Sequence, residues 1–172
     1  MSLRIIDVDK GYKKIRAFAG ASGSVKVGVP DTPHQPSGIP TDEIAKKHEF
    51  GDGNVPQRSF LRAWVDANES RITSKARTSL LWALETGAPF NEALGLLGQW
   101  SVWGVRAFIN KKIPPPLAKA TLARKKGEFR KIPLIDTAQL WNSITAEVEG
   151  KQGQVVVTVD ASAGELDDTV IV

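Results

Sequence analysis

One segment constrains this 172-residue chain more than any other: residues 90–110, FNEALGLLGQWSVWGVRAFIN, are apolar on nearly every side. Gly87 and Pro89 precede the segment and three prolines follow it at positions 114–116, so the sequence predicts one helix with defined ends. A helix without a polar face cannot be surrounded by water. It must be enclosed by its own chain, as the central core helix, or by copies of the chain at a subunit interface.

A second, amphipathic helix is predicted immediately before the apolar one. From Phe60 onward, apolar residues recur at helical spacings and charged residues fill much of the remainder. Phe60 and Leu61 are expected to anchor this helix in the core. The apolar positions on or near one face are Leu61, Val65, Ile72, Ala76, Leu80 and Leu84.

Shorter elements are predicted on both sides of this helical pair. Helices are expected at residues 9–19 and 41–51, with Asp9 and Thr41 as their N-caps. The alternating valines of residues 24–29 and the β-branched run of residues 154–161 each predict a strand. Residues 30–40 contain four prolines and are expected to form a long exposed loop.

A last helix is predicted after Asp136. Leu140, Ile144 and Val148 form an apolar stripe, and either Asp136 or Thr137 is placed to accept backbone N–H bonds at the helix start. The length of the chain is that of a single domain covering residues 1–172. Within it, residues of about 30–40 and 112–132 are expected to be exposed loops, and residues 161–172 a C-terminal tail.

The chemistry expected of an enzyme is not found in the sequence. The chain has no cysteine, which excludes disulfides, thiolate metal sites and thiol catalysis. Its two histidines, His34 and His48, have no second histidine at metal-ligand spacing, and no serine lies in a G-x-S-x-G elbow. We therefore expect a protein that is not an enzyme and has no metal and no cofactor. No secretory signal and no membrane association are expected either.

Charge is distributed unevenly along the chain. Residues 106–131 contain nine Lys and Arg against the single acid Glu128, whereas residues 160–172 contain four acids and no base. Three interpretations of the basic stretch are open: a solvated loop, a loop that docks on an acidic partner or lines a nucleic-acid channel, and a dedicated DNA reader. No helix-turn-helix, zinc-finger or RNA-binding signature supports the last of these.

Three blocks of the sequence, taken together, resemble a known family. KKHEFGDGNVPQRSFLR resembles the block A-x-x-H-E-F-G…I-P-x-R-P-F-L-R, PPPLAKATLARKKG resembles P-L-x-x-x-T-x-x-R-K-x-x-G, and PLIDTAQLWNSITAEV resembles P-L-x-D-T-G-x-L-x-x-S-I-x-x-x-V. In this order, with a long helical region between the first and second, the blocks are similar to those of neck or tail-completion proteins of long-tailed bacteriophages and prophages. Lambda minor tail protein Z and the Mu-type virion morphogenesis proteins are of this kind.

The resemblance implies an α+β fold, in which long helices pack against a small antiparallel β-sheet with extended loops or arms. It also implies a structural virion protein, assembled in the host bacterial cytoplasm, that forms a homo-oligomeric ring and joins the tail to the head connector. A hexamer is the natural expectation. The family signature falls on His48, Glu49, Phe50, Gly51, Pro56, Arg58, Phe60, Leu61, Arg62, Pro133, Leu134, Asp136, Thr137, Leu140, Ser143 and Ile144.

Two positions depart from the family pattern. Ser59 stands where proline is usual, and Ala138 stands where glycine is usual. Because alanine resists positive φ, the second departure raises the question whether the turn after Asp136 keeps the family geometry.

The expected partners are other copies of the chain and the neck, connector and tail proteins, with non-specific contact to DNA in the channel as a further expectation. Arg58 and Arg62 lie at the start of a helix, where the dipole disfavours cations, so an acidic partner is expected for one of them, across a subunit boundary. The basic stretch is expected to be a mobile loop that becomes ordered on docking, with Glu165–Asp168 as its complement.

The alternative function is a basic DNA-associated protein that acts outside a virion. The residues expected at the interface are Phe50, Arg58, Phe60, Arg62, Lys111, Lys112, Arg124, Lys125, Lys126, Arg130, Lys131, Asp136 and Thr137.

Overall fold

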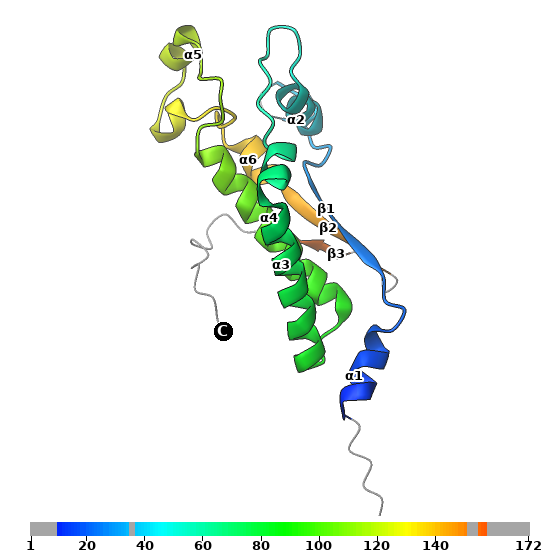
Figure 1. Ribbon diagram of the computed structural model, residues 1–172. Helices are drawn as coiled ribbons and strands as arrows, with labels where there is room; N and C mark the ends of the chain where they lie inside the picture. The colour runs from blue at the N-terminus through cyan, green and yellow to red at the C-terminus, as the bar shows by residue number, and fades with distance from the viewer. Residues whose placement is uncertain (1–9, 35–36, 151–154, 158–172) are drawn as a thin grey trace, which may run out of the picture.

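The computed structural model, which describes residues 10–34, 37–150 and 155–157, has the α+β architecture expected (Figure 1). A pair of long helices lies against a small antiparallel sheet, and shorter helices lie at the two ends of the molecule. In chain order the elements are α1 (Lys10–Phe18), β1 (Gly23–Gly28), α2 (Thr41–Phe50), α3 (Arg62–Thr86), α4 (Phe90–Asn110), α5 (Lys119–Arg124), the 3-10 helix η1 (Glu128–Lys131), α6 (Gln139–Ser143), β2 (Thr145–Gly150) and β3 (Val155–Val157).

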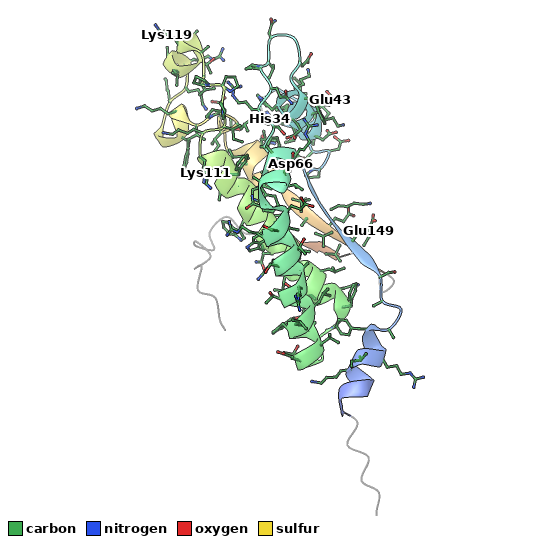
Figure 2. The ribbon with its side chains drawn as sticks, in the orientation of Figure 1. His34, Glu43, Asp66, Lys111, Lys119 and Glu149 are labelled. Atoms are coloured by element: carbon green, nitrogen blue, oxygen red, sulfur yellow. The ribbon has the colours of Figure 1, made fainter. Side chains whose placement is uncertain are left out.

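The sheet has three antiparallel strands in the order β1-β2-β3. Gly23 of β1 pairs with Gly150 at one end and Gly28 pairs with Thr145 at the other, so the first and last thirds of the chain are joined. Val25 and Val27 of β1 pack against the core, and Lys26 between them is exposed. On the outer face Lys26 forms an ion pair of 2.5 Å with Glu149, whose side chain is labelled in Figure 2.

Helix α4 lies between α3 and the sheet and contacts both (Figure 1). Two of its glycines allow this close approach. A Cβ added at Gly98 would lie 2.9 Å from the Cβ of Ala146 in β2, and one added at Gly104 would lie 2.3 Å from the indole of Trp64 in α3. Most of the apolar helix is therefore covered by its own chain, as the first of the two alternatives expects, and Leu96 and Ala107 on it are exposed. The subunit-interface alternative stays a prediction for that exposed part.

The core is formed where these layers meet. Phe60, Val102, Ile109, Ala146 and Val148 are completely buried. The expectation that Phe60 anchors the start of the long helix is confirmed. Leu61 packs against the same core and is partly buried.

The helix predicted from Asp136 through Val148 is wrong. Helix α6 has only five residues and ends at Ser143, and β2 begins at Thr145. Leu140, Ile144 and Val148 recur every four residues. This spacing is close to one helical turn, and it is also twice the two-residue period of a strand, so it fits either structure. Ile144, Ala146 and Val148, which are buried at a spacing of two, decide for the strand.

Two expectations concern the N-caps of the short helices. Thr41 is not a cap: it is the first residue of α2, it is completely buried, and its hydroxyl donates to the Thr32 carbonyl at 2.7 Å. Asp9 lies outside the described residues, as do the C-terminal tail and positions 154 and 158–161 of the predicted strand. Within the described ranges, no helix has the length and apolar character that crossing a membrane requires.

Candidate functional site

Most residues expected to be functional lie at one end of the molecule. Helix α2, residues 51–61 and residues 111–138 come together there, at the end opposite α1 (Figure 1). Regular hydrogen-bonded structure is sparse in this region, which we call the loop end. Three buried charged side chains, each bonded to backbone groups of another segment, hold it together.

The first of these side chains is Glu49, near the end of α2, whose carboxylate caps the start of α3. Its Oε2 accepts hydrogen bonds from the backbone N–H groups of Phe60 and Leu61 at 2.8 and 3.0 Å. Its Oε1 accepts from the Arg62 N–H at 3.1 Å and from the Ser59 hydroxyl at 2.5 Å. Helix α3 has no cap from its own N-cap side chain, so Glu49 serves instead.

The environment of Glu49 favours its charged form. Burial alone raises the pKa of this carboxyl, but the hydrogen bonds from the Ser59 hydroxyl and from the three backbone N–H groups together outweigh it. The pKa of Glu49 is therefore lower than that of an ordinary glutamate. A full negative charge is held where the helix dipole of α3 is positive.

The second buried charge is Arg58. Its side chain is 5% exposed, and its Nε and Nη2 donate to the carbonyls of Pro115 and Pro116 at 2.8 and 3.2 Å. The Arg58 backbone N–H donates to the His48 carbonyl at 2.7 Å, which ties α2 to the same point. Burial lowers the pKa of Arg58. Prolines supply carbonyls but no N–H groups, so a side-chain donor is a suitable partner for this turn.

The third is Lys125, which follows α5. It is 9% exposed, and its Nζ donates to the Ile132 carbonyl at 2.9 Å and also to the Ile135 carbonyl. Burial lowers the pKa of Lys125, the Asp136 carboxylate acts in the opposite direction, and the positive charge of Arg58 lowers it further. The chain between α5 and α6 is folded around this ammonium group.

Two expectations about basic residues need correction. An acidic partner was expected for Arg58 or Arg62, and Lys125 was expected to belong to an exposed, mobile loop. The structure corrects these expectations at Arg58 and at Lys125. Both are buried and bonded to carbonyls of their own chain, because a carbonyl-rich turn surrounds each of them. The exposed loop expected at residues 112–132 also contains α5 and η1. Arg62 is exposed, and the expectation of an acidic partner remains a prediction for it.

The cap expected before α6 is also different. The N-cap residue is Ala138, in the left-handed conformation with φ of 60°, and α6 has no N-cap side-chain hydrogen bond. Thr137 Oγ1 accepts a weak bond of 3.4 Å from the Gln139 N–H, and Asp136 is exposed. Ala138 thus adopts a positive φ, at some conformational cost.

A cleft of about 620 Å³ opens between α2, α5 and the segment before α6. Its walls include the aliphatic side chains of Ile44, Leu117, Leu134 and Leu140. Its polar lining consists of His34, His48, Thr121, Arg124, Lys125, Lys126, Asp136, Thr137 and Gln139. We call this the α2–α5 cleft. It brings together five of the expected interface residues, Arg124, Lys125, Lys126, Asp136 and Thr137.

The remaining expected residues lie outside the cleft. Lys112 and Lys131 line a smaller hollow of about 310 Å³ with Pro114, Pro116 and Pro133, and Lys111 is exposed at the end of α4 (Figure 2). Phe50 is 62% exposed, and the Arg62 guanidinium lies 5.7 Å from the centre of its ring. The side chain of Arg130 is outside the described part of the chain.

Sequence reasoning missed the structural role of Glu49 and did not place the histidines. Glu49 is part of the resembling HEFG block, but an acid near the end of a polar helix gives no sign that it caps another helix. His48 lines the cleft, and its Nδ1 is buried without a hydrogen-bond partner among the described residues. Burial lowers the pKa of His48, and the charge of Arg58 lowers it further.

Chemically, the α2–α5 cleft offers cationic and hydroxyl donors above apolar walls. Such a surface suits a segment that carries carboxylates or phosphates next to aliphatic groups. In the described ranges, no three His, Asp or Glu side chains are grouped so that they could hold a metal ion. Comparison with family models, curated proteins and solved structures found no match to this chain.

Proposed function

We propose that the chain is a structural, non-enzymatic component of a long-tailed bacteriophage or prophage virion. In this proposal it forms a neck or tail-completion ring of identical subunits, with a hexamer as the expected size. The ring joins the tail to the head connector, and the protein is assembled in the cytoplasm of the host bacterium.

The observation that carries the proposal is the interlocking of the three resembling blocks. Arg58 of the first block bonds to Pro115 and Pro116 of the second, and Lys125 of the second bonds to Ile132 and Ile135 around the start of the third. These bonds bring the three blocks into one region of the molecule, as is expected if they form one shared signature.

The exposed surface supports the oligomeric part of the proposal. Phe50 and Phe129 are at least half exposed at or near the loop end, and Leu81 and Trp82 are exposed on α3. Large apolar side chains at a surface are typical of contacts with other proteins. A closed ring needs two different faces on each subunit, and these residues lie on separate elements.

The proposal is tested on the purified full-length chain by light scattering across a range of concentrations and by electron microscopy. We expect rings of one size that form as concentration rises and that bind isolated phage tails. Arg62→Ala should weaken ring formation if Arg62 has an acidic partner on the next subunit, and Arg77→Ala on α3 is the matched control. A chain that stays monomeric and ignores tails would contradict the proposal.

A second candidate function, binding of DNA outside a virion, is favoured by one observation. Lys111, Lys112, Lys119, Arg124, Lys126 and Lys131 are exposed between the end of α4 and the Pro133 turn, and none forms an ion pair with another described residue (Figure 2). Binding of a DNA duplex should then fall steeply as salt rises, because each phosphate contact releases counterions. Affinity that hardly changes with salt would contradict this candidate.

A further inference from the structure

The α2–α5 cleft has an unbalanced charge. Arg124, Lys125 and Lys126 follow one another along its wall, and Asp136 is its only described acid. Among the described residues, none of these three cations forms an ion pair. Arg58, buried nearby, contributes further positive charge, since it lowers the pKa of both His48 and Lys125. Positive charge therefore exceeds negative charge at this cleft, where Asp136 is the one described counter-charge.

The cleft also has apolar walls, in which Ile44, Leu117 and Leu134 are half-buried and Leu140 is buried. Ile44 comes from α2, Leu117 precedes α5, and Leu134 and Leu140 come from the segment around α6. A simple anion would use the cations and leave these aliphatic surfaces in water. The complement of the whole cleft is a segment of chain with carboxylates next to aliphatic side chains.

The sequence contains a stretch with this composition. Residues 165–172 read ELDDTVIV, with three carboxylates within four residues and the aliphatic run Val170, Ile171 and Val172 after them. These residues lie outside the described part of the chain. Seven residues separate Val157, the last described residue, from Glu165. That connection spans at most about 29 Å when fully extended, for eight steps of about 3.6 Å.

We propose that the α2–α5 cleft is the docking site for residues 165–172 of this chain, taken from the same copy or from a neighbouring one. The carboxylates of Glu165, Asp167 and Asp168 lie at the Arg124 and Lys126 side of the cleft. The aliphatic residues that follow lie along the apolar walls. The proposal does not depend on ring formation, since the assigned occupant is the same segment whichever copy supplies it.

Zero-length cross-linking of the full-length chain tests this directly. A carbodiimide joins an ammonium group to a carboxylate only when the two are in contact, and mass spectrometry identifies the pair. We expect links from Lys126 to Glu165, Asp167 or Asp168. Lys75 and Lys111, which lie on α3 and after α4, should give at least tenfold fewer links to the same acids. Equal yields at all these lysines would overturn the proposal.

A charge exchange adds a test in which the reacting lysine is untouched. Arg124→Glu should lower the yield of the Lys126 links about tenfold, and Arg77→Glu, a reversal of an exposed arginine on α3, should leave it unchanged. Combining Arg124→Glu with Asp167→Arg should restore the links to Glu165 and Asp168. An Arg124→Glu chain that melts at the wild-type temperature and still gives the full yield would overturn the proposal.

Mixing chains labelled with different nitrogen isotopes identifies the copy that supplies the segment. If both cross-linked peptides always carry the same isotope, the tail occupies the cleft of its own copy. If linked pairs carry different isotopes, the tail occupies the cleft of a neighbouring copy. Either result supports the assigned occupant. A ring that assembles on tails without any of these links would overturn this inference and leave the proposed function standing.

Discussion

The two ends of the α3–α4 pair are built on different physical principles. Between the helices and the sheet, the contacts are mainly apolar, with completely buried residues such as Val102, Ile109 and Val148. A buried exception is Arg106 of α4, which is 1% exposed and donates from Nη2 to the carbonyls of Asn142 and Ile144. At the loop end, the groups that join the segments are Glu49, Arg58 and Lys125, which bond to backbone N–H and carbonyl groups. We call the first region, which consists of α3, α4 and the sheet, the helix–sheet body.

The difference follows from what each region has to satisfy. In the helix–sheet body, most backbone groups are paired within helices and strands, so most side chains only need to fill space. Arg106 alone among its described charged side chains is buried, and it bonds to the carbonyls of Asn142 and Ile144 where α6 meets β2. In the loop end, a proline-rich chain leaves carbonyls unpaired and the start of α3 leaves N–H groups unpaired. Charged side chains on extended stems satisfy these groups from a distance. The loop end can therefore be shaped without a large apolar core of its own.

The largest expected effect comes from a substitution in the apolar core. Phe60 is completely buried, and Phe60→Ala should lower the free energy of unfolding by about 3–5 kcal/mol, through lost burial and the cavity left behind. Phe50→Ala is the matched control, because Phe50 is 62% exposed, and it should change stability by less than about 0.5 kcal/mol. Urea unfolding measures both. Equal losses would contradict the description of the core.

A smaller and more local effect is expected at Arg58. Arg58→Met keeps the bulk of the stem but removes both hydrogen bonds to the proline carbonyls, so we expect a loss of about 1–2 kcal/mol. Amide hydrogen exchange should rise in residues 117–137 and remain slow in α4. Arg62→Met, at an exposed position, is the control and should leave both regions unchanged. If amide exchange rose equally in α4, the loop end and the helix–sheet body would unfold together, which would contradict the contrast between them.

Ala138 offers a change of opposite sign. Its φ of 60° is unfavourable for alanine, and Ala138→Gly should stabilise the protein by roughly 0.5–1 kcal/mol, if the relief of backbone strain exceeds the added entropy of the unfolded chain. Thermal unfolding measures the change. Ala107→Gly, at an exposed position inside α4, is the control and should destabilise by roughly the same amount. A loss of stability in both variants would contradict the inference that the turn at Ala138 is strained.

The same contrast explains which features could be predicted from sequence. Helices α3 and α4 were predicted because their apolar residues follow the 3.6-residue period and because glycine and proline mark their ends. Strand β2 was missed because Leu140, Ile144 and Val148 have a spacing that suits a helix as well. No local sequence pattern indicates that Lys125 is buried while Lys126 beside it is exposed. Lys125 is buried because it bonds to the Ile132 and Ile135 carbonyls, which only the folded chain brings next to it.

The last prediction uses pH to separate two neighbouring groups of the loop end. The folded-state pKa of His48 lies below its ordinary value of 6.5, so the unfolded chain binds the proton first as the pH falls. Stability should therefore begin to decrease below about pH 6.5. The folded-state pKa of Glu49 lies below its ordinary value of 4.5, so the stability supplied by its charge is complete above about pH 4.5 and is lost as the pH falls further.

The upper decline is assigned to His48, and the lower one to Glu49 together with Asp42, whose pKa is also lowered, chiefly by its hydrogen bond with Lys46. His48→Gln should abolish the decline that begins near pH 6.5 and keep the lower one. Glu49→Gln should reduce the lower decline, keep the upper one and lower stability at neutral pH. His34→Gln is the control for the upper decline, which should remain. Urea unfolding at a series of pH values measures all four proteins. Because Glu49 bonds to the backbone of α3 whereas His48 only lines the cleft, the lower decline should be the one that also exposes the α3 N-terminus to hydrogen exchange.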